Sequence, residues 1–231
     1  EGRMQERRSP TLGLRAKGWL ECVTRPELEV EGGSYPVMTP SAARGLFEAV
    51  VWKPAISWRI ERIRVLNEIR FVSFRRNEVN NRAIKPSAAV IQNGGEIRHY
   101  FVDEDRAQRN TVALFDVDYI IEGKFSMTES AGASDNVNKF VDMFARRVAK
   151  GQHFHQPYLG CREFPAQILT TEDAPSPIQD SRELGLMLWD IDYTGKKNRP
   201  VFFAANLENG VLEVPEDPLA TLDNYSHRGT T

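Results

Sequence analysis

Two histidines stand out as residues whose type and spacing could do chemistry, because an imidazole can bind a metal ion or transfer a proton near neutral pH. His153 and His155 lie two positions apart, so on a strand both would face the same side and could share a metal. No carboxylate or cysteine stands at a spacing that would complete the ligand set. The sequence also lacks the glycine-rich phosphate loop, the G-x-S-x-G elbow and the H-E-x-x-H motif, which excludes those enzyme classes. We therefore expect neither a metal nor a cofactor.

Basic and aromatic residues interleave in two stretches, 58–64 and 74–78. Arginine side chains can pair with phosphates, and aromatic rings can stack on unpaired bases, so this mixture is compatible with RNA binding. For 58–64 we favour a simple strand with one exposed face. For Arg75 and Arg76, which precede a polar stretch, RNA contact and a solvated surface carry equal weight.

The overall charge limits where a nucleic acid could bind. The 231 residues carry 30 Lys and Arg against 32 Asp and Glu, a formal net charge of −2, so a nucleic-acid site must be a local basic patch. Cys22 and Cys161 are too few for a disulfide framework and lack zinc-site spacing, so we expect reduced, packed thiols. No run approaches the roughly 20 apolar residues of a membrane helix, and no signal peptide is visible. This predicts a cytoplasmic protein without a membrane partner.

Two helices should position these groups. Thr39 can cap the first helix, Pro40 suits its first position, and an apolar stripe follows until Trp-Lys-Pro at 52–54 ends it. The second helix should begin at a cap provided by Ser134 or Asp135.

The second helix should end at Gly151, a residue that tolerates the left-handed conformation of a helix C-terminus. Its predicted buried face comprises Val137, Phe140, Val141, Phe144 and Val148. One flank carries the cations Lys139, Arg146 and Lys150. That flank is either a solvated helix face or part of a basic patch.

The remaining apolar segments are predicted to be strands, because they are rich in β-branched and aromatic residues with partial alternation. They cover residues 12–22, 56–66, 69–74, 111–127 and 159–169. Interleaved with two helices, this order gives the split βαβ arrangement of an α+β, ferredoxin-like (RRM-like) domain over residues 4–170. Residues 1–3, before Met4, resemble the remnant of an expression tag.

The last part of the chain has a different sequence pattern, with two apolar segments separated by a short polar stretch. Segments 186–193 and 200–207 predict two strands, followed by a turn at Asn209-Gly210. We expect them to form a small antiparallel β-sheet domain, residues 181–222, appended to the first domain after an acidic linker at 171–180. Residues 77–95 should form a mobile insertion between strands, and 223–231 a frayed tail.

Several longer motifs, in one order, resemble the Cas-five-d family of CRISPR-associated proteins, subtype I-C (Dvulg type). The likeness runs from about residue 14 to 214 and is carried by TRPE at 24–27, SYPVMTPSAARG at 34–45, WKP at 52–54, RRNEV at 75–79, GQHFHQPYLGCREF at 151–164, DIDY at 190–193 and FF at 202–203. The expected RNA-binding residues are cations of these motifs and of the second helix: Arg44, Lys53, Arg75, Arg76, Arg146 and Arg162.

The resemblance implies a ferredoxin-like domain with a C-terminal sheet, and an endoribonuclease that cuts precursor CRISPR RNA beside the repeat hairpin without a metal. Family members keep the 5′ handle of the product. They join backbone and large subunits in the type I-C interference complex (Cascade), which meets target DNA through the guide RNA. In the reaction a ribose 2′-hydroxyl attacks the adjacent phosphate, so the protein must move protons and stabilise the phosphorane.

The sequence departs from the family at two positions that bear on catalysis. In relatives the proposed catalytic group is an aromatic or imidazole residue before Trp-Lys-Pro and a Lys-His pair in the second helix. Here Val51 and Phe140 replace two of these, and only Lys139 is retained, as an electrostatic catalyst. Either another group supplies the proton transfer, with His155 ahead of His153 and Tyr158, or the chain is a noncatalytic guide-RNA-binding and assembly subunit.

Overall fold

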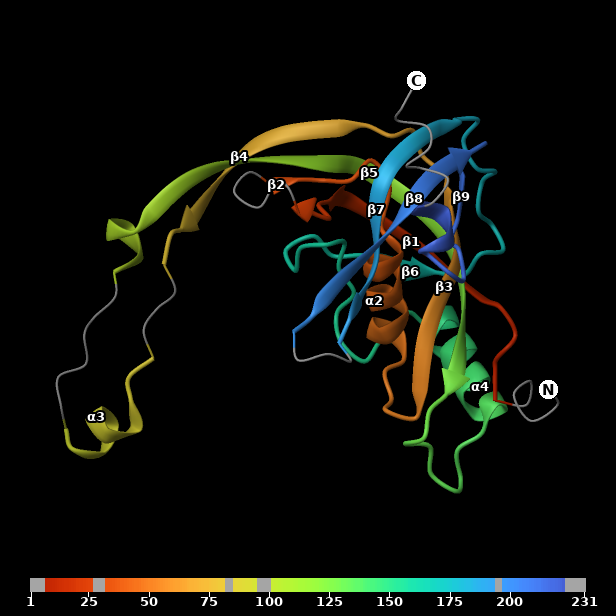
Figure 1. The fold of residues 1–231 in the computed structure, drawn as a ribbon, viewed down its shortest axis with the longest axis horizontal. Helices are drawn as coiled ribbons and strands as arrows, with labels where there is room; N and C mark the ends of the chain where they lie inside the picture. The colour runs from red at the N-terminus through yellow and green to blue at the C-terminus, as the bar shows by residue number, and fades with distance from the viewer. Residues whose placement is uncertain (1–6, 27–31, 82–84, 95–100, 194–196, 223–231) are drawn as a thin grey trace.

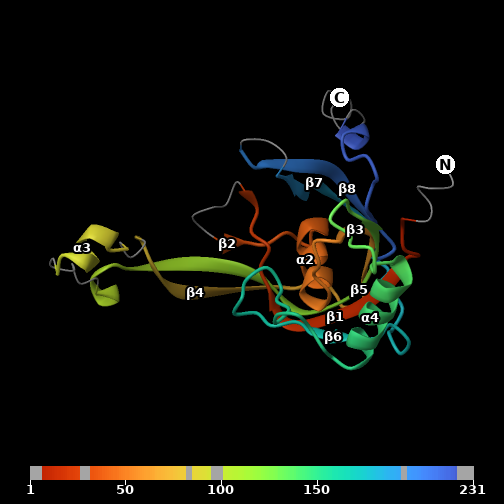
Figure 2. The same cartoon turned by 90° about the horizontal axis from the view of Figure 1, so that it is seen from below.

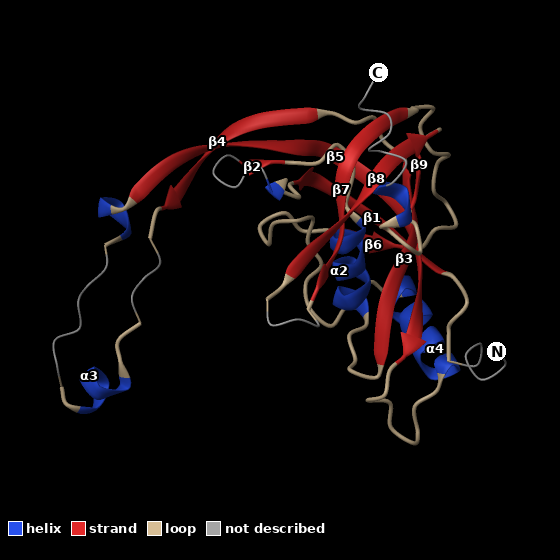
Figure 3. Ribbon diagram, viewed as in Figure 1, coloured by secondary structure: helices blue, strands red, loops and turns tan. Residues whose placement is uncertain are grey.

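The computed structural model describes residues 7–26, 32–81, 85–94, 101–193 and 197–222. They form an α+β fold with one curled, mostly antiparallel sheet and few helices (Figures 1 and 3). In chain order the elements are β1 (Leu12–Glu21), β2 (Gly32–Gly33), α2 (Pro40–Val50), β3 (Ile56–Val65), β4 (Phe71–Val79), α3 (Ala88–Gln92), the 3-10 helix η2 (Val102–Glu104), β5 (Arg106–Met127), α4 (Val137–Ala149), β6 (Gln167–Leu169), β7 (Arg182–Asp192), β8 (Arg199–Glu208) and β9 (Val211–Glu213). No helix in the described part of the chain is both long enough and apolar enough to span a bilayer.

The long strand β5 is the centre of the sheet. Its second half pairs antiparallel with β1 and β3, and its first half pairs with β4 and, in parallel, with β2. The strand order through the described residues is β6-β1-β5-β3-β9-β8-β7. In the chain α2 lies between β1 and β3, and α4 between β5 and β6. Each helix therefore connects strands that are not neighbours in the sheet.

The sheet curls around α2 (Figure 2). The helix contacts both β3 and β7, although β9 and β8 separate these strands in the sheet. An ion pair fastens this closure, because the Arg44 guanidinium of α2 donates two hydrogen bonds of 2.8 Å to the Asp190 carboxylate of β7.

An aromatic cluster joins both helices to the sheet. Phe47 of α2 stacks on Phe144 of α4 with ring centroids 5.1 Å apart, and Trp58 of β3 packs against both rings. Phe140 of α4 meets Phe125 of β5 edge to face. The apolar stripe predicted for the second helix is confirmed, since Phe140, Phe144 and Val148 are buried.

The helix ends agree with the sequence except at one cap. Thr39 accepts a hydrogen bond from the Ala42 backbone N–H (3.2 Å), as predicted. In α4 the cap is Asn136, which accepts from the Lys139 backbone N–H (2.9 Å), so the expected cap at Ser134 or Asp135 is wrong by one or two residues. Asp135 instead bonds the Lys139 ammonium (2.8 Å).

The strand predicted at 159–169 is mostly wrong, because only Gln167–Leu169 form β6. The chain turns before it at Gly160, whose φ is 79°. A Cβ atom at Gly160 would lie 2.0 Å from the Cys22 carbonyl oxygen, so this turn packs directly on the chain that leaves β1. The Cys22 N–H donates to the Leu159 carbonyl (3.1 Å) and holds the two segments together.

The C-terminal strands continue the main sheet. β7 and β8 form the predicted hairpin, and β9 follows the predicted turn, where Asn209 and Gly210 have φ values of 48° and 74°. β9 then pairs with β3 at Arg62–Arg64. The division into domains 4–170 and 181–222 stays a prediction, and both Met4 and 223–231 lie outside the described residues.

β4 and the first half of β5 form an arm that leaves the body of the protein (Figure 1). The residues of β4, Phe71–Val79, pair in register with the stretch from Leu114 back to Arg106. The strand is longer than predicted and enters the stretch expected to be an insertion, 77–95, which also contains α3. Residues 82–84 and 95 of that stretch lie outside the described residues.

Glu21 is a buried carboxyl at the end of β1. The Tyr119 hydroxyl of β5 donates a hydrogen bond to its Oε2 atom (2.7 Å), while Oε1 has no hydrogen-bond partner among the described residues. Burial raises the pKa of Glu21 to about 7, although the hydrogen bond from Tyr119 acts in the opposite direction.

The folded protein should therefore lose stability as the pH rises through this group. Between the ordinary carboxyl value of 4.5 and about 7, folded Glu21 keeps a proton that the unfolded chain has released. The free energy of unfolding should fall across that window by on the order of 3 kcal/mol. Glu21→Gln should remove this loss, so its stability advantage over wild type should grow between pH 5 and pH 8 in urea unfolding.

A matched control is Glu129→Gln, the same chemical change at an exposed turn residue, which should keep the wild-type pH dependence. If Glu21→Gln and wild type differ by the same amount at both pH values, another group is responsible for the pH dependence.

Candidate nucleic-acid interface

Three segments meet at the C-terminal end of α2. Carbonyls at a helix end have no partner inside the helix and must find one elsewhere. The donors are the backbone N–H groups of Phe154 and His155 for Ala49 (2.7 and 3.3 Å), the Arg147 guanidinium for Val50 (2.6 Å) and the Trp58 indole for Val51 (2.9 Å). These bonds hold α4, the loop after it and β3 against the 52–54 loop.

Trp52 and Phe154 form an exposed aromatic pair at this helix end. Their ring centroids are 5.8 Å apart, their planes are inclined by 26°, and the residues are 48% and 58% exposed. The ring of His155 lies 5.9 Å from that of Phe154. This pair could not be predicted from the sequence, although both residues belong to motifs that carry the resemblance, because nothing local connects the two segments.

Lys53 and Lys139 act on the same carboxylate. The Lys139 ammonium lies 2.8 Å from Asp135 Oδ1, and this contact lowers the pKa of Asp135, with the Gly132 N–H and the charge of Lys53 acting in the same direction. The Thr128 hydroxyl, in the turn that leads to α4, donates to the Pro54 carbonyl (2.6 Å) and fastens that turn to the 52–54 loop. Lys139 is therefore paired with Asp135, whereas Lys53 is exposed and forms no ion pair with a described residue.

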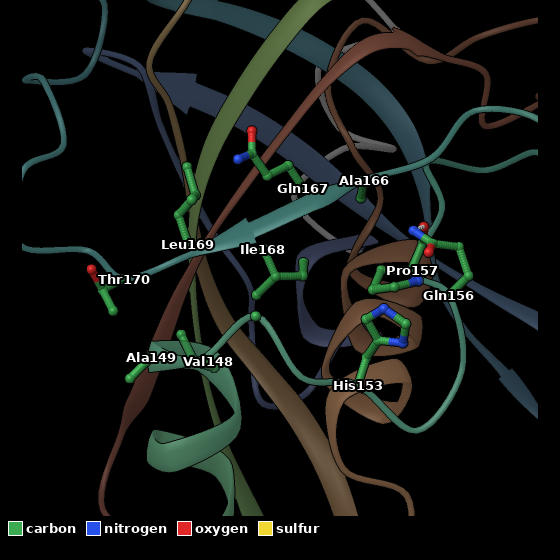
Figure 4. Close-up of a pocket in the computed structure, with 11 residues that line it drawn as sticks. Val148, Ala149, His153, Gln156, Pro157, Ala166, Gln167, Ile168, Leu169 and Thr170 are labelled. Atoms are coloured by element: carbon green, nitrogen blue, oxygen red, sulfur yellow. Dashed lines mark hydrogen bonds between the residues drawn. The ribbon is translucent and has the colours of Figure 1, made fainter.

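The two histidines face different cavities. His155 and Tyr158 line a cavity of about 390 Å³ beside the first turns of α2. His153 lines another, of about 370 Å³, formed with the end of α4 and with β6 (Figure 4). They lie in a loop rather than on a strand, so the spacing does not direct them to one site. Within the described ranges, no group of three or more His, Cys, Asp or Glu is placed to hold a metal ion.

The two predicted catalytic residues, Lys139 and His155, are connected to the 52–54 loop through different neighbours. Lys139 pairs with Asp135 in the turn that Thr128 fastens to Pro54, and His155 reaches the loop through the rings of Phe154 and Trp52. Among the described residues, no hydrogen bond or ring contact joins Lys139 to His155 directly. The two residues therefore do not form a directly bonded pair in this structure, and their joint role stays a prediction.

Val51 and Phe140 are part of the core. They are 0% and 1% exposed and belong to the cluster that contains Phe47 and Trp58. Neither side chain reaches solvent, so neither position is open to an RNA phosphate in this structure.

The two arginines of the arm have different surroundings. Arg75 is exposed, and no described residue forms a hydrogen bond or ion pair with its side chain. Arg76 is ion-paired with Glu163 and lies 5.8 Å from the centre of the Phe164 ring. Only Arg75 therefore offers an uncompensated charge, while Arg76 fastens the arm to the turn before β6.

The other predicted RNA-binding cations also differ in whether a carboxylate or another acceptor already binds them. Arg44 is held by Asp190 and Glu48; burial would lower the pKa of Arg44, but these carboxylates raise it above its ordinary value. Arg146 is exposed and donates to Gln152 Oε1 (3.0 Å), and Arg162 is exposed. Contact of each with RNA stays a prediction, and the geometry of Arg44 is that of a structural ion pair.

The two thiols lie together and form no disulfide. Cys161 Sγ is 3.6 Å from the Cys22 carbonyl oxygen. A hydrogen bond with the Cys22 thiol lowers the pKa of Cys161 to about 7; burial opposes this shift and Arg76 adds to it. The same hydrogen bond and burial raise the pKa of Cys22. Cys22 is buried and Cys161 half-buried, in agreement with the expectation of packed thiols.

The outer face of the central strands carries balanced charge. Arginines and lysines there pair with carboxylates: Arg15–Asp118 (2.6 Å), Arg62–Glu122 (3.1 Å), Arg64–Glu122 (2.8 Å), Arg62–Glu213 (2.6 Å), Arg59–Glu216 (2.5 Å) and Lys124–Glu61. The interpretation of 58–64 as a strand is confirmed, and its charged face is half-buried beneath these ion pairs. The cations of this face are paired with carboxylates, as on an ordinary solvated surface. Cations without a carboxylate partner must therefore be sought elsewhere on the protein.

Comparison with known proteins gives matches along nearly the whole chain. The family described as CRISPR-associated protein (Cas_Cas5) matches residues 11–215. A protein of Mannheimia succiniciproducens, named CRISPR pre-crRNA endoribonuclease Cas5d, is 46% identical over 213 residues, which are 88% of this chain and 94% of that protein. A protein of Thermus thermophilus with the same name is 37% identical over 225 residues, 88% of this chain and 92% of that protein.

A solved structure titled "Crystal Structure of CRISPR-associated Protein" shares the fold. It has a TM-score of 0.66 at 20% identity and covers 93% of this chain and 95% of its own. At this identity the likeness concerns the fold alone. From the family match and the two sequence relatives, the chain belongs to the CRISPR-associated Cas5d family.

Proposed function

We propose that this chain binds precursor CRISPR RNA and cleaves it at the repeat hairpin without a metal ion. The observation that carries this proposal is the 46% identity, over nearly the full length of both chains, to a protein named a pre-crRNA endoribonuclease. The surface around the 52–54 loop supports it, because the exposed aromatic pair Trp52–Phe154 lies on the same loop as the exposed Lys53.

Within the α+β class, we propose that the core of the fold is ferredoxin-like. In that arrangement two βαβ crossovers interleave, so that four antiparallel strands have the order fourth, first, third, second. The order β6-β1-β5-β3 with α2 and α4 as crossovers fits this description. The arm and strands β7 to β9 are then additions to the ferredoxin-like unit.

In the proposed reaction a ribose 2′-hydroxyl attacks the adjacent phosphate and leaves a cyclic phosphate and a 5′-hydroxyl. Lys139 stabilises the charge of the phosphorane, and it exchanges its contact with Asp135 for the phosphate when RNA is bound. His155 transfers a proton, since its ring is exposed beside Phe154 and beside the cavity that Tyr158 also lines.

After cleavage the chain keeps the 5′ handle as a cytoplasmic subunit of the type I-C interference complex, together with the backbone and large subunits. Target DNA is met indirectly, through the guide RNA. The charge distribution supports such partnership: a net charge of −2 and a local basic surface give limited means of gripping a long RNA alone.

A noncatalytic guide-RNA-binding and assembly subunit is the second candidate. Burial of Val51 and Phe140 favours it, because the two positions that carry proton-transfer groups in relatives here hold apolar core side chains. The two candidates differ in cleavage and agree in RNA binding.

Purified protein incubated with its cognate repeat RNA in excess chelator distinguishes them. The endoribonuclease should give a single cut with a cyclic phosphate on the upstream fragment, as resolved by gel electrophoresis and mass spectrometry. Intact RNA that is nonetheless bound would establish the noncatalytic subunit, and cleavage only after addition of a divalent ion would refute the metal-free reaction.

Lys139→Ala should lower the cleavage rate roughly 100-fold while changing RNA affinity only a few-fold, because a positioned cation acts on the transition state. Single-turnover cleavage and filter binding measure the two effects. Lys150→Ala, which removes the same charge at the other end of α4, should leave both close to wild type. Equal loss of cleavage and binding in Lys139→Ala would mean that this lysine only holds a phosphate.

Arg75→Ala should reduce the salt dependence of RNA binding, whereas Arg76→Ala should not. Each phosphate contact contributes about 0.7 to the slope of log K against log salt for a single strand, and only Arg75 has a free guanidinium. Titrations at several salt concentrations give the slopes. An unchanged slope for Arg75→Ala would place the outer face of the arm outside the interface.

A further inference from the structure

The exposure of Trp52 and Phe154 is not required by the fold. The aromatic rings that the core uses are buried, while these two stand at the surface with about half of their area open to solvent. Large apolar side chains gathered at one exposed place mark a binding surface more often than scattered single ones. The pair is therefore suited to bind a ligand with a flat, apolar face.

The backbone that carries both rings is held in place before any ligand arrives. The backbone N–H of Phe154 donates to the Ala49 carbonyl (2.7 Å), and the carbonyl of Val51, just before Trp52, accepts from the Trp58 indole (2.9 Å). The same helix end therefore fixes both backbone segments. Binding to a preformed pair avoids most of the entropy lost in ordering loops and side chains.

The surroundings of the pair are cationic rather than apolar. Lys53 follows Trp52 in the chain, is exposed and forms no ion pair with a described residue, and the Arg147 guanidinium lies at the same helix end, 2.6 Å from the Val50 carbonyl. A protein partner would be expected to continue the apolar contact, whereas a nucleotide combines a stacking base with a phosphate for the ammonium groups. Charge complementarity thus selects RNA.

We propose that Trp52 and Phe154 form a binding site for one unpaired RNA base, stacked on the open face of the pair, with the phosphates of that nucleotide beside Lys53. This proposal rests on the proposed function. It adds a stacking platform that fixes the register of the RNA against the 52–54 loop. Trp52 and Phe154 are positioning residues, since they hold the strand without reaching the reacting atoms.

The chain contains an aromatic pair that serves as a matched control. Trp19 is 67% exposed and meets Phe115 edge to face, with centroids 4.5 Å apart. Its surroundings are charge-balanced, because Asp116 and Glu163 line the same cavity as Lys17, and Arg70, 5.3 Å from the centre of the Phe115 ring, pairs with Asp116. This pair offers one exposed ring beside a half-buried one and no net positive charge, and it should not bind RNA.

The test measures affinity for repeat-derived single-stranded RNAs that each carry one abasic position, using fluorescence anisotropy. For wild type, removal of one particular base should weaken binding roughly 5- to 100-fold, as expected for a single stacked base. In Trp52→Leu and Phe154→Leu that same abasic change should have no further effect. Trp52→Phe should largely keep the base dependence, and Trp19→Leu should keep it fully.

A fluorescent base analogue, 2-aminopurine, placed at the same position tests the site in the unaltered protein. Its emission should fall on binding to wild type, because it stacks on an aromatic ring, and should not fall with Trp52→Leu. Abasic profiles that are identical in wild type and both leucine variants would overturn the base site while leaving RNA binding intact. A wild-type protein that binds none of these RNAs would overturn the proposed function along with it.

Discussion

The carbonyl groups at the end of α2 are the constraint on which the rest of the site depends. A helix end leaves its last carbonyls without intrahelical partners, and each one buried unpaired would cost about 1–3 kcal/mol. Here the donors come from α4, from β3 and from the loop after α4, so satisfying the helix end brings all three to one place. The 52–54 loop is held there, with Val51 buried beneath it and Trp52 facing solvent.

Charge is distributed so that a nearly neutral chain still offers local positive sites. The outer face of the central strands uses its cations in ion pairs with carboxylates, while Lys53 is exposed and forms no ion pair with a described residue. Arg75 on the arm is uncompensated as well, whereas Arg44 closes the sheet around α2. The number of arginines in a motif is therefore a poor guide to RNA contact; the partner of each guanidinium decides.

In α4, two adjacent residues have different surroundings: Lys139 is exposed and Phe140 is buried in the core. Successive residues of an α-helix point about 100° apart, so Lys139 can lie at the surface while Phe140 points into the core. Phe140 completes the aromatic cluster by meeting Phe125 edge to face. In the proposed reaction, proton transfer would then come from outside α4, and the candidate His155 lies in the loop that the end of α2 holds beside the 52–54 loop.

The sequence by itself determined the local features. The cap at Thr39, the apolar stripe of α4 and the hairpin turn at Asn209 depend only on residues within one or two turns of each other, and all were predictable. Tertiary structure alone decided that Trp52 meets Phe154, and that the turn at Gly160 replaces a predicted strand. These features join segments far apart in the chain, where shared buried hydrogen bonds and close packing set the geometry and local propensity carries no information about it.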